Sequence, residues 1–594
     1  MTWVAWGCLA AAAGSLPLFT ANTYYLYVAT SVGLLTIVTS GLNVLVGFTG
    51  QMSLGHAGFY AIGAYAAAIL TTRAGWSAWA AILVAILVAA LAGAGVAGAA
   101  LRVTGPYLAM VTIAFGIIVE SLLVEWVSVT GGPGGIFNIP KPSLHAFYWV
   151  IMGGAAVSLW LVANLRRSAW GRAFLAVKGS DVAAESLGLS AYYVRIMAFT
   201  VSAGFAGAAG GLFALLNGYV SPDSFTLQTS ILFLLALLFG GEGRVAGPVA
   251  GSIALTLLPE FLTSLADFRL ILYGGLLMCS IYWLPTGVIG VLAPRRAGRF
   301  VASDKDSDRG GNSDSDSDSD GGRGSDRDGD GDKGGDSGRA APLLQVEKAS
   351  LAFGGVAALS EVTLTVPARG IQAVIGPNGA GKTTLLNALS GFYVPDSGGI
   401  RLREVPVAGR PPYAIARLGV ARTFQTAQVF GDLSVAENVA VGVAGPRLGS
   451  VVAALVGAPW TREAERRLRR RALALLAEAG LTEWAERPAD ALPAGLRRRL
   501  EIVRALARRP RLLLLDEPAA GLAPPEIAEL DAYLARLRDT GGPAVVLVEH
   551  HMDLVMAVSD HITVLDYGRV IASGTPETVR TNPAVIEAYL GASG

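Results

Sequence analysis

The hydrophobic pattern divides the chain into two dissimilar parts. Over roughly the first 295 residues, apolar stretches recur that are each long enough, at about 20 residues, to cross a bilayer as a helix. Clear examples are Leu26–Val46, Ala78–Leu101, Tyr107–Val129 and Phe147–Leu165. An earlier stretch, Trp3–Phe19, lacks the basic start of a signal peptide and is followed by many more spans, so it is predicted to be a retained membrane helix. The pattern predicts a polytopic α-helical membrane domain of about eight to ten spans.

From Leu343 onward the pattern is that of a water-exposed α/β domain. Short apolar strands at Gln372–Ile375, Arg511–Leu515 and Ala544–Val548 alternate with helical segments. This alternation is typical of a mostly parallel sheet covered by helices. The chain is therefore expected to join a membrane domain to an α/β domain.

A polar segment separates the two parts. Ser303–Arg339 contains no apolar side chain, and its 12 Asp outnumber its 6 Lys and Arg. Such a segment cannot bury enough surface to order itself, so we expect a disordered tether. Calcium binding by the Asp repeats is the alternative, but the spaced glutamate of a calcium loop is missing. The expected domains are 1–297 in the membrane, 298–342 as linker and 343–594 as the α/β domain.

A phosphate-binding motif occupies Gly376–Thr384, read Gly-Pro-Asn-Gly-Ala-Gly-Lys-Thr-Thr. It follows an apolar strand and opens a helix near Lys382, which is the context that such a loop requires. Its glycines let backbone N–H groups surround phosphates, Lys382 can reach the β- and γ-phosphate oxygens, and Thr383 can hold Mg²⁺. The motif predicts that the chain binds ATP with Mg²⁺. The net charge of +1 gives no electrostatic support for a nucleic-acid partner.

Two carboxylates follow the second buried strand, about 130 residues after the phosphate loop. Asp516 can support the metal, and Glu517 can polarise an attacking water. Two acids at a strand end are a weak signal alone. In this order after a phosphate loop they indicate ATP hydrolysis.

From about Leu343 to its end the chain resembles the ATP-binding cassette (ABC) family. The resemblance implies that Phe353 contacts adenine, that Gln425 contacts the metal and the membrane partner, and that His550 contacts the γ-phosphate. Without it, Phe353 would be read as a core aromatic residue and Gln425 as a solvated loop residue. The residues expected to act in catalysis are Glu517 and His550; those expected to bind the cofactor are Phe353, Gly376, Pro377, Asn378, Gly379, Ala380, Gly381, Lys382, Thr383, Thr384, Gln425 and Asp516; those expected at the metal are Thr383, Gln425 and Asp516.

One family landmark is altered. The family's usual Leu-Ser-Gly-Gly-Gln, which completes the ATP site of a partner cassette, stands here as Leu492-Pro493-Ala494-Gly495-Leu496. Proline offers neither a hydroxyl nor an N–H, so the phosphate contact of the family's serine is absent. Ala523 also stands where many relatives have Asp. The departures put in doubt the site that this cassette completes for its partner.

The glycine motifs of the membrane part resemble the permease subunits of the branched-chain amino-acid importer family. They are Gly50–His56, Gly105–Met110 and Phe239–Gly243, and small residues at such positions let membrane helices approach closely. The cassette resembles the first ATPase subunit of the same family, and the membrane part its second permease. His56 and Glu242 are ionisable groups in or beside apolar spans, where they serve either function or a structural hydrogen bond.

A basic loop lies between two predicted spans. Arg166, Arg167, Arg172, Lys178 and Arg195 place it on the cytoplasmic side. Its part from Val182 to Gly188 resembles the family's coupling helix, which fits a groove of the ATPase. Anchoring of the loop to lipid headgroups is the alternative.

Together these features predict one permease fused to one ATPase of a bacterial ABC importer for branched-chain amino acids. The expected location is the cytoplasmic membrane, with the ATPase domain and linker on the cytoplasmic side. The expected partners are a second permease, a second ATPase subunit and an extracytoplasmic solute-binding protein. Alternatives are import of another small solute, such as urea or a short amide, export, and a membrane-anchored ATPase with a regulatory role.

Overall fold

The computed structural model describes residue 17, residues 22–101, 105–261 and 342–590, and scattered positions between 271 and 292. The chain forms two compact units. One comprises Met1–Ala297 with Arg410–Leu522, and the other Gly298–Gly409 with Ala523–Gly594. The predicted linker lies outside the described residues except for Pro342. The proposed domain boundaries therefore stay a prediction.

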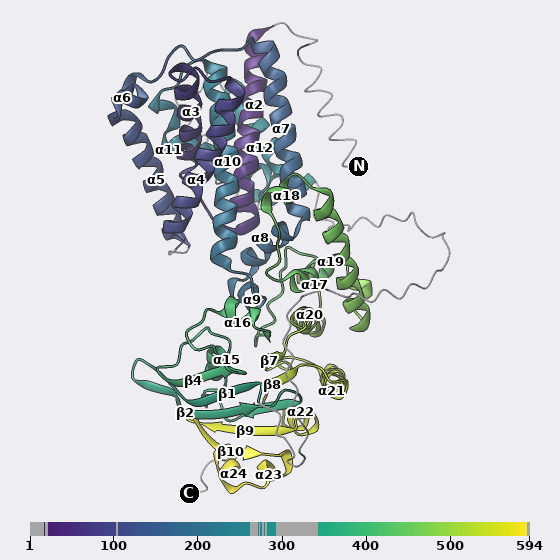
Figure 1. Ribbon diagram of the computed structural model, residues 1–594. Coiled ribbons are helices and arrows are strands. Elements are labelled where there is room, and N and C mark those ends of the chain that lie inside the picture. Colours follow the sequence, from purple (N-terminus) through teal and green to yellow (C-terminus); the bar gives the residue numbers. More distant parts are fainter. Residues whose placement is uncertain are drawn as a thin grey trace, which may run out of the picture. The chain divides into compact units, whose positions relative to one another are not determined.

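The membrane part of the first unit is helical (Figure 1). Its α2 continues into a π-helical turn, η1, and the chain then runs without regular structure from Gly50 to Gly55 before α3 begins. The elements are α2 (Thr23–Leu42), η1 (Asn43–Gly47), α3 (His56–Thr72), α4 (Ala78–Ala100), α5 (Pro106–Glu125), α6 (Val127–Thr130), η2 (Gly132–Gly134), α7 (Leu144–Arg167), α8 (Ala169–Gly179), α9 (Asp181–Ser186), α10 (Ala191–Asn217), η3 (Pro222–Phe225), α11 (Leu227–Gly240), α12 (Gly247–Phe261) and α14 (Val288–Leu292).

Six helical segments in the described part of the chain are long and apolar enough to cross a membrane. The prediction of a polytopic helical membrane domain is thus confirmed. The number of eight to ten crossings stays a prediction, because most of Trp3–Phe19 and of 262–287 lies outside the described residues. The six segments are Thr23–Gly47, Ala78–Ala100, Pro106–Glu125, Leu144–Arg167, Ala191–Asn217 and Pro222–Gly240.

Glycines bring the backbones of α3 and α10 into contact. A Cβ atom added at Gly63 would lie 2.3 Å from the carbonyl oxygen of Gly207, and one at Gly210 would lie 2.0 Å from that of Tyr60. Both distances are far below a normal contact, so only glycine fits. Close approach of this kind gives van der Waals packing between helices that lipid cannot provide.

The first unit also holds the middle of the cassette. Strand β6 pairs in parallel with β7, and Val420 lies opposite Leu512. All five residues of β7 are buried, which explains the continuous apolar run that predicted this strand. The elements are α16 (Pro412–Arg417), β6 (Val420–Arg422), α17 (Val435–Ala444), α18 (Val451–Leu455), α19 (Pro459–Glu478), η5 (Thr482–Trp484), η6 (Ala489–Ala491), α20 (Ala494–Leu506) and β7 (Leu512–Asp516).

The second unit contains the strands on either side of the phosphate loop. Strand β3 pairs in parallel with both β8 and β9, and β10 pairs antiparallel with β9. A separate antiparallel sheet has the order β2-β1-β4-β5. The elements are β1 (Leu344–Phe353), β2 (Val356–Val366), β3 (Ile371–Ile375), α15 (Lys382–Leu389), β4 (Ser397–Leu402), β5 (Val405–Pro406), α21 (Pro524–Asp539), β8 (Ala544–Val548), α22 (Met552–Val558), β9 (His561–Asp566), β10 (Arg569–Gly574), α23 (Pro576–Arg580) and α24 (Pro583–Leu590).

The glycine contact between α3 and α10 yields a stability prediction. Gly210→Ala should lower the thermal midpoint of the detergent-purified protein by several degrees, because overpacking of this kind costs about 1–3 kcal/mol. Gly95→Ala in α4 is the matched control, since a Cβ there meets nothing within 4 Å. Unfolding followed by intrinsic fluorescence measures both. Equal midpoints for the two variants would contradict the close contact.

Candidate nucleotide site and its link to the membrane helices

The phosphate loop lies between β3 and α15, as predicted. Gly376, Gly379 and Gly381 have φ angles of 151°, 84° and 97°, which side-chain-bearing residues rarely adopt. A Cβ at Gly376 would lie 2.0 Å from the carbonyl oxygen of Leu565, and one at Gly381 would lie 2.5 Å from that of Ala358. Three of the loop's residues must therefore be glycine for the loop to have this shape.

The Lys382 side chain folds back over the loop. Lys382 is the first residue of α15, and its ammonium donates to the carbonyl oxygens of Gly376 at 2.8 Å and Pro377 at 2.9 Å. Thr383 and Thr384 follow in the first turn of the helix. A cation and a helix N-terminus placed together attract a phosphate group. The loop therefore has the geometry for phosphate binding.

Two more candidate residues of this unit lie at strand ends. Phe353 ends β1, is 46% exposed, and meets the Tyr393 ring edge-on with 5.1 Å between centroids. It is thus an accessible aromatic ring and not a core residue. His550 is exposed just after β8, and its backbone N–H donates to Glu549 Oε2 at 2.9 Å.

The carboxylate pair belongs to the first unit. Asp516 is 1% exposed at the end of β7, and Arg422 Nη2 donates to its Oδ2 at 3.1 Å. Burial raises the pKa of Asp516 above its usual value, while the charge of Arg422 opposes this. Its Oδ1 is buried with no hydrogen-bond partner in the described part of the chain. An uncompensated carboxylate oxygen is costly, and a magnesium ion or a water bound to one would satisfy it.

Glu517 is held in an uncommon backbone conformation. Its φ angle of 45° is left-handed, a region that glutamate seldom occupies. Its Oε2 accepts a hydrogen bond of 2.8 Å from Gln425 Nε2. The structure thus brings together Gln425 and Glu517, two residues that the sequence separates by about 90 positions.

A buried arginine fixes both of these residues. The Arg498 guanidinium donates to the carbonyl oxygens of Phe424 and Gln425, to Glu501 Oε2 at 2.9 Å, and to the Glu517 carbonyl oxygen at 3.4 Å. Burial raises the pKa of Glu501, and two nearby arginines oppose the shift. Arg498 thereby ties the loop carrying Gln425 to the strand end carrying Glu517.

No group of three or more His, Cys, Asp or Glu side chains in the described ranges has the spacing of a metal site. A magnesium ion bound with ATP does not need one. In phosphate-loop proteins its ligands are a hydroxyl, a carboxylate and the phosphate oxygens. Thr383 and Asp516 carry the first two of these groups, each within its own unit.

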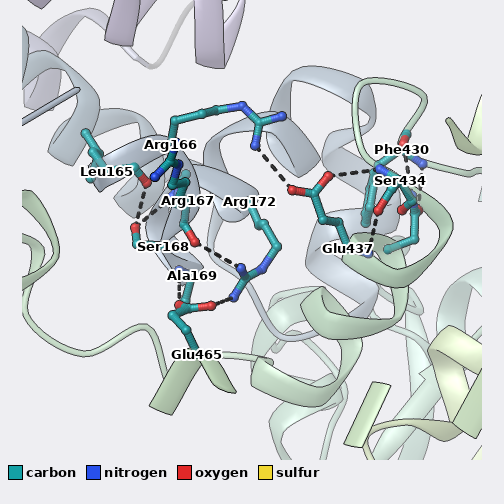
Figure 2. A network of polar contacts seen from close by, with 12 residues as sticks. Leu165, Arg166, Arg167, Ser168, Ala169, Arg172, Phe430, Ser434, Glu437 and Glu465 are labelled. Atoms are coloured by element: carbon teal, nitrogen blue, oxygen red, sulfur yellow. Dashed lines mark hydrogen bonds and ion pairs between the residues drawn. The ribbon is translucent and has the colours of Figure 1, made fainter. Parts of the chain in front are cut away.

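An ion-pair network joins the end of α7 and α8 to residues 410–522, which are called the cassette segment below (Figure 2). Arg172, 3% exposed at its side chain, donates through Nη2 to Glu465 Oε2 at 2.6 Å. The other carboxylate oxygen of Glu465 accepts from the Ala169 N–H, also at 2.6 Å. Arg166 lies 3.5 Å from Glu437, whose other oxygen accepts from the Ser434 N–H. Each glutamate is thus held at two points.

Helix α9 lies against the cassette, as its likeness to a coupling helix predicts. Arg417 Nε donates to the Gly188 carbonyl oxygen at 3.1 Å, and Arg508 donates to that of Leu187. Burial lowers the pKa of Arg508 to about 10, and Arg417 and Arg447 add to the shift. Because a guanidinium stays protonated near neutral pH, it keeps donating when desolvated.

Lys178 of α8 joins three parts of the first unit. Its ammonium donates to the Gly47 carbonyl oxygen at 3.0 Å and to Glu242 Oε1 at 3.2 Å, and lies 3.8 Å from Asp432 Oδ2. These groups belong to the π-helical turn, the loop after α11 and the cassette. Glu242 is therefore engaged in a structural ion pair.

His56 is fully buried and has a partner for each ring nitrogen. Nδ1 lies 2.8 Å from Ser53 Oγ and Nε2 lies 2.7 Å from Ser202 Oγ. An imidazole with a hydrogen bond at each of its two nitrogens is compatible with a structural role. It ties the irregular Gly50–Gly55 segment to α10.

Three protein families match the chain. The family described as branched-chain amino acid transport system / permease component matches residues 24–281, and the ABC transporter family matches residues 359–520. The family described as branched-chain amino acid ATP-binding cassette transporter matches residues 569–594. Both halves of the chain thus point to one transport system.

Two relatives in sequence agree with these family matches. The branched-chain amino acid transport ATP-binding protein BraF of Pseudomonas aeruginosa is 46% identical over 250 residues, 42% of this chain and 98% of BraF. The permease protein LivM of Escherichia coli is 36% identical over 299 residues, 45% of this chain and 70% of LivM. A solved nucleotide-free ATP-binding cassette from an ABC transporter is 30% identical, covers 42% of this chain and 99% of its own length, and has a TM-score of 0.37.

The chain belongs to the branched-chain amino acid ABC transporter family. It is a multi-pass membrane protein with an ABC ATPase domain, and its permease and ATPase parts each match a separate protein of the family. The resemblance drawn from the motifs is thereby confirmed.

The altered signature segment begins α20. Pro493 is the cap residue of this helix, with no side-chain hydrogen bond, and Gly495 lies in its first turn. The helix start therefore has no hydroxyl for a phosphate. The structure thus shows the missing hydroxyl at the start of α20, whereas the weakening of a partner's ATP site stays a prediction.

Arg498 is the site residue that sequence reasoning missed. It is the second of three consecutive arginines, Arg497–Arg499, that follow the signature segment. A usable signal existed, because Arg498, Glu501 and Arg504 recur at helical spacing on the buried side of α20. Charged residues at buried helical positions indicate a network, since they are rarely buried without partners.

The network at α8 yields a testable energy difference. A double-mutant cycle of Arg172→Ala and Glu465→Ala should show a coupling energy of roughly 1–3 kcal/mol in thermal unfolding, because Arg172 is desolvated. The matched control is Arg467 and Glu463 on α19, whose side chains are 74% and 41% exposed. That pair should couple by less than about 1 kcal/mol. Equal coupling in both cycles would show that the Arg172 pair is as solvated as a surface pair.

Proposed function

We propose that this chain is the fused permease and ATPase subunit of a bacterial importer that uses ATP to move branched-chain amino acids across the cytoplasmic membrane. The observation that carries the proposal is the docking of α8 and α9, which connect two membrane helices, on the cassette segment through the buried Arg172–Glu465 pair. A membrane anchor for an ATPase would need only one span and no such contact. The descriptions of BraF and LivM both name branched-chain amino acids as the transported solutes, which supports the choice of solute.

The proposed hydrolytic roles follow from the positions of the side chains. Gly376–Thr384 would surround the phosphates, and Lys382 would exchange its carbonyl partners for phosphate oxygens. Glu517 would polarise the attacking water. Gln425, which donates a hydrogen bond to Glu517, would orient the Glu517 carboxylate. His550 would contact the γ-phosphate, and Phe353 would stack on adenine.

A magnesium ion would be held by Thr383, Asp516 and Gln425. When bound, it would neutralise charge that develops on the phosphate oxygens. The buried Oδ1 of Asp516 supports this role, because it has no other partner among the described residues. Arg422 would keep Asp516 ionised by opposing the effect of burial on its pKa.

Arg498 would carry the change at the nucleotide toward the membrane. It binds the carbonyl oxygens of Phe424, Gln425 and Glu517, so a shift of Glu517 or Gln425 moves its hydrogen bonds. The same loop continues to Phe430, which packs in one apolar cluster with Ala183 and Leu187 at α9. Two discrete arrangements of this contact would give alternating access.

The chain would be half of a transporter. We propose as partners a second permease, a second ABC ATPase subunit and an extracytoplasmic solute-binding protein. The cassette and the linker would lie on the cytoplasmic side, with the domains divided at about residues 297 and 342. The function is tested by measuring the uptake of leucine and of urea into vesicles that hold the complete transporter and ATP, and leucine uptake is expected. Uptake of urea alone would assign another solute. No uptake of either solute would contradict import.

Two substitutions separate ATP binding from hydrolysis. Lys382→Ala should abolish ATP-driven uptake while the protein still reaches the membrane, because the ammonium binds loop carbonyls and supports no core. Glu517→Gln should bind ATP but not turn it over, because it loses the group that polarises water. ATPase and nucleotide-retention assays measure both, with Arg467→Ala on the exposed face of α19 as control. Wild-type turnover in Glu517→Gln would show that another base serves.

The altered signature segment predicts unequal ATP sites. The missing serine contact, a charge-assisted bond of about 1.5–3 kcal/mol, weakens the site that this chain completes for its partner. The chain purified alone should therefore hydrolyse ATP poorly, and adding the second cassette and permease should restore solute-stimulated activity. In the full complex, disabling the Lys382 loop should cost more activity than disabling the partner's loop. Equal losses would contradict the asymmetry, and full activity of the chain alone would contradict the half-transporter assignment.

A further inference from the structure

Helix α18 of the cassette lies beside the end of a membrane helix. Asn164 Nδ2, in the last turn of α7, donates to the Leu455 carbonyl oxygen at 3.1 Å, and a Cβ at Gly457 would lie only 2.9 Å from the same nitrogen. Figure 1 shows α18 next to α7, level with the lower parts of the membrane helices and above the lower end of α10. Part of the cassette segment thus reaches the depth at which α7 ends.

The outward side of α18 is apolar. Val452 of α18 is 64% exposed, its cap residue Val456 is 47% exposed, and Trp460, in the first turn of α19, is 70% exposed. These three residues are called the apolar stripe below. The inward side is also apolar, because Ala453 and Ala454 are buried. A short helix that is apolar on both sides is not one that water solvates well.

An exposed tryptophan of α7 lies one turn from the contact between α7 and α18. Trp160 of α7 is 48% exposed, and it lies one turn before Asn164 on the same face of that membrane helix. Asn164 in turn binds α18. An exposed tryptophan in a membrane span faces lipid or another membrane helix, and the hydrogen bond from Asn164 places the end of α18 one turn further along the same face of α7.

Exposed basic side chains lie close to these apolar residues in the sequence or at the end of α7. Arg167, Arg447 and Arg462 are exposed beside α18 in sequence or at the end of α7. Helix α19, which begins at Pro459, carries six arginines and three glutamates. Arginine with tryptophan and valine is the composition that binds the headgroup region of an anionic leaflet. A second protein subunit would match the apolar side chains but gains nothing from this excess of positive charge.

We propose that Val452, Val456 and Trp460 insert into the cytoplasmic leaflet of the membrane and that Arg447 and Arg462 contact anionic phospholipid headgroups. The cassette of this chain is then attached to the bilayer directly, besides its contacts with α8 and α9. The lipid contact restrains α18 and the start of α19. The same helix α19 carries Glu465, which Arg172 binds. Neither the identity of the solute nor import itself enters this inference.

Spin labelling tests the insertion. The full chain is reconstituted with its partners in phospholipid vesicles containing phosphatidylglycerol, with Cys8 and Cys279, its only two cysteines, replaced by serine. A nitroxide on Val456→Cys should collide more often with oxygen, which partitions into lipid, than with a water-soluble nickel chelate. The control label is on Arg470→Cys, 75% exposed and about 15 Å further along α19 than Trp460. It should show the reverse preference.

Two results would overturn the proposal. A Val456 label with the same preference as the Arg470 label would show that α18 lies in water. A label shielded from both reagents would show that a protein subunit covers the stripe instead.

Lipid charge provides the second measurement. Replacing phosphatidylglycerol by phosphatidylcholine should reduce the oxygen preference of the Val456 label by at least twofold, and Arg447→Gln with Arg462→Gln should make it insensitive to this replacement. Arg467→Gln, on the exposed face of α19, is the matched control and should stay sensitive. An oxygen preference that does not depend on lipid charge would refute the arginine contacts.

Discussion

Buried guanidinium groups hold the first unit together. Arg172, Arg498, Arg504 and Arg508 are largely removed from water, and each donates to a carboxylate or to backbone carbonyl oxygens. Removing a charge from water is expensive, so such a group stabilises only when nearly all its donors are used. Arginine suits the task because its five N–H groups form a rigid fork that can bind several acceptors at once.

This arrangement has a mechanical consequence. Arg498 binds residues at the carboxylate end of the proposed nucleotide site. Arg508 of the cassette binds the Leu187 carbonyl oxygen after α9, and Arg172 of α8 binds Glu465 of the cassette. Arg498 and Arg508 lie within the cassette segment, residues 410–522, and Arg172 of α8 lies against it. The segment therefore cannot move without exchanging several desolvated hydrogen bonds, which favours two discrete positions over a continuous range.

The membrane helices follow a different rule. In lipid there is no hydrophobic force between helices, so α3 and α10 associate through backbone contact at Gly63, Gly207 and Gly210. Several polar groups inside the bundle are paired, as for His56 with Ser53 and Ser202. The π-helical turn and the loop after α11 are joined by Asn43, which donates to the Arg244 carbonyl oxygen and accepts from the Gly243 N–H. Protein groups thus satisfy the irregular backbone at Gly243 and Arg244, where a bilayer offers no water to do so.

The sequence by itself determined the local features of this protein. Long apolar runs can satisfy their backbone in lipid only as helices, so the membrane helices were readable without a structure. The phosphate loop was equally readable, because Gly376, Gly379 and Gly381 are needed for its backbone angles and lie within six positions. Family membership followed from such contiguous motifs.

Only the tertiary structure decided which distant residues meet. The pairing of Gln425 with Glu517, of Arg172 with Glu465, and of Asn164 with α18 joins positions that are tens to hundreds of residues apart. The helical spacing of Arg498, Glu501 and Arg504 marks one face of α20, but only packing decides that this face is buried. The same holds for Val452, Val456 and Trp460, because only the structure shows that these apolar side chains are exposed and that α18 lies beside a membrane helix. Sequence patterns report the periodicity of one element, whereas contacts between elements depend on packing, which has no local signal.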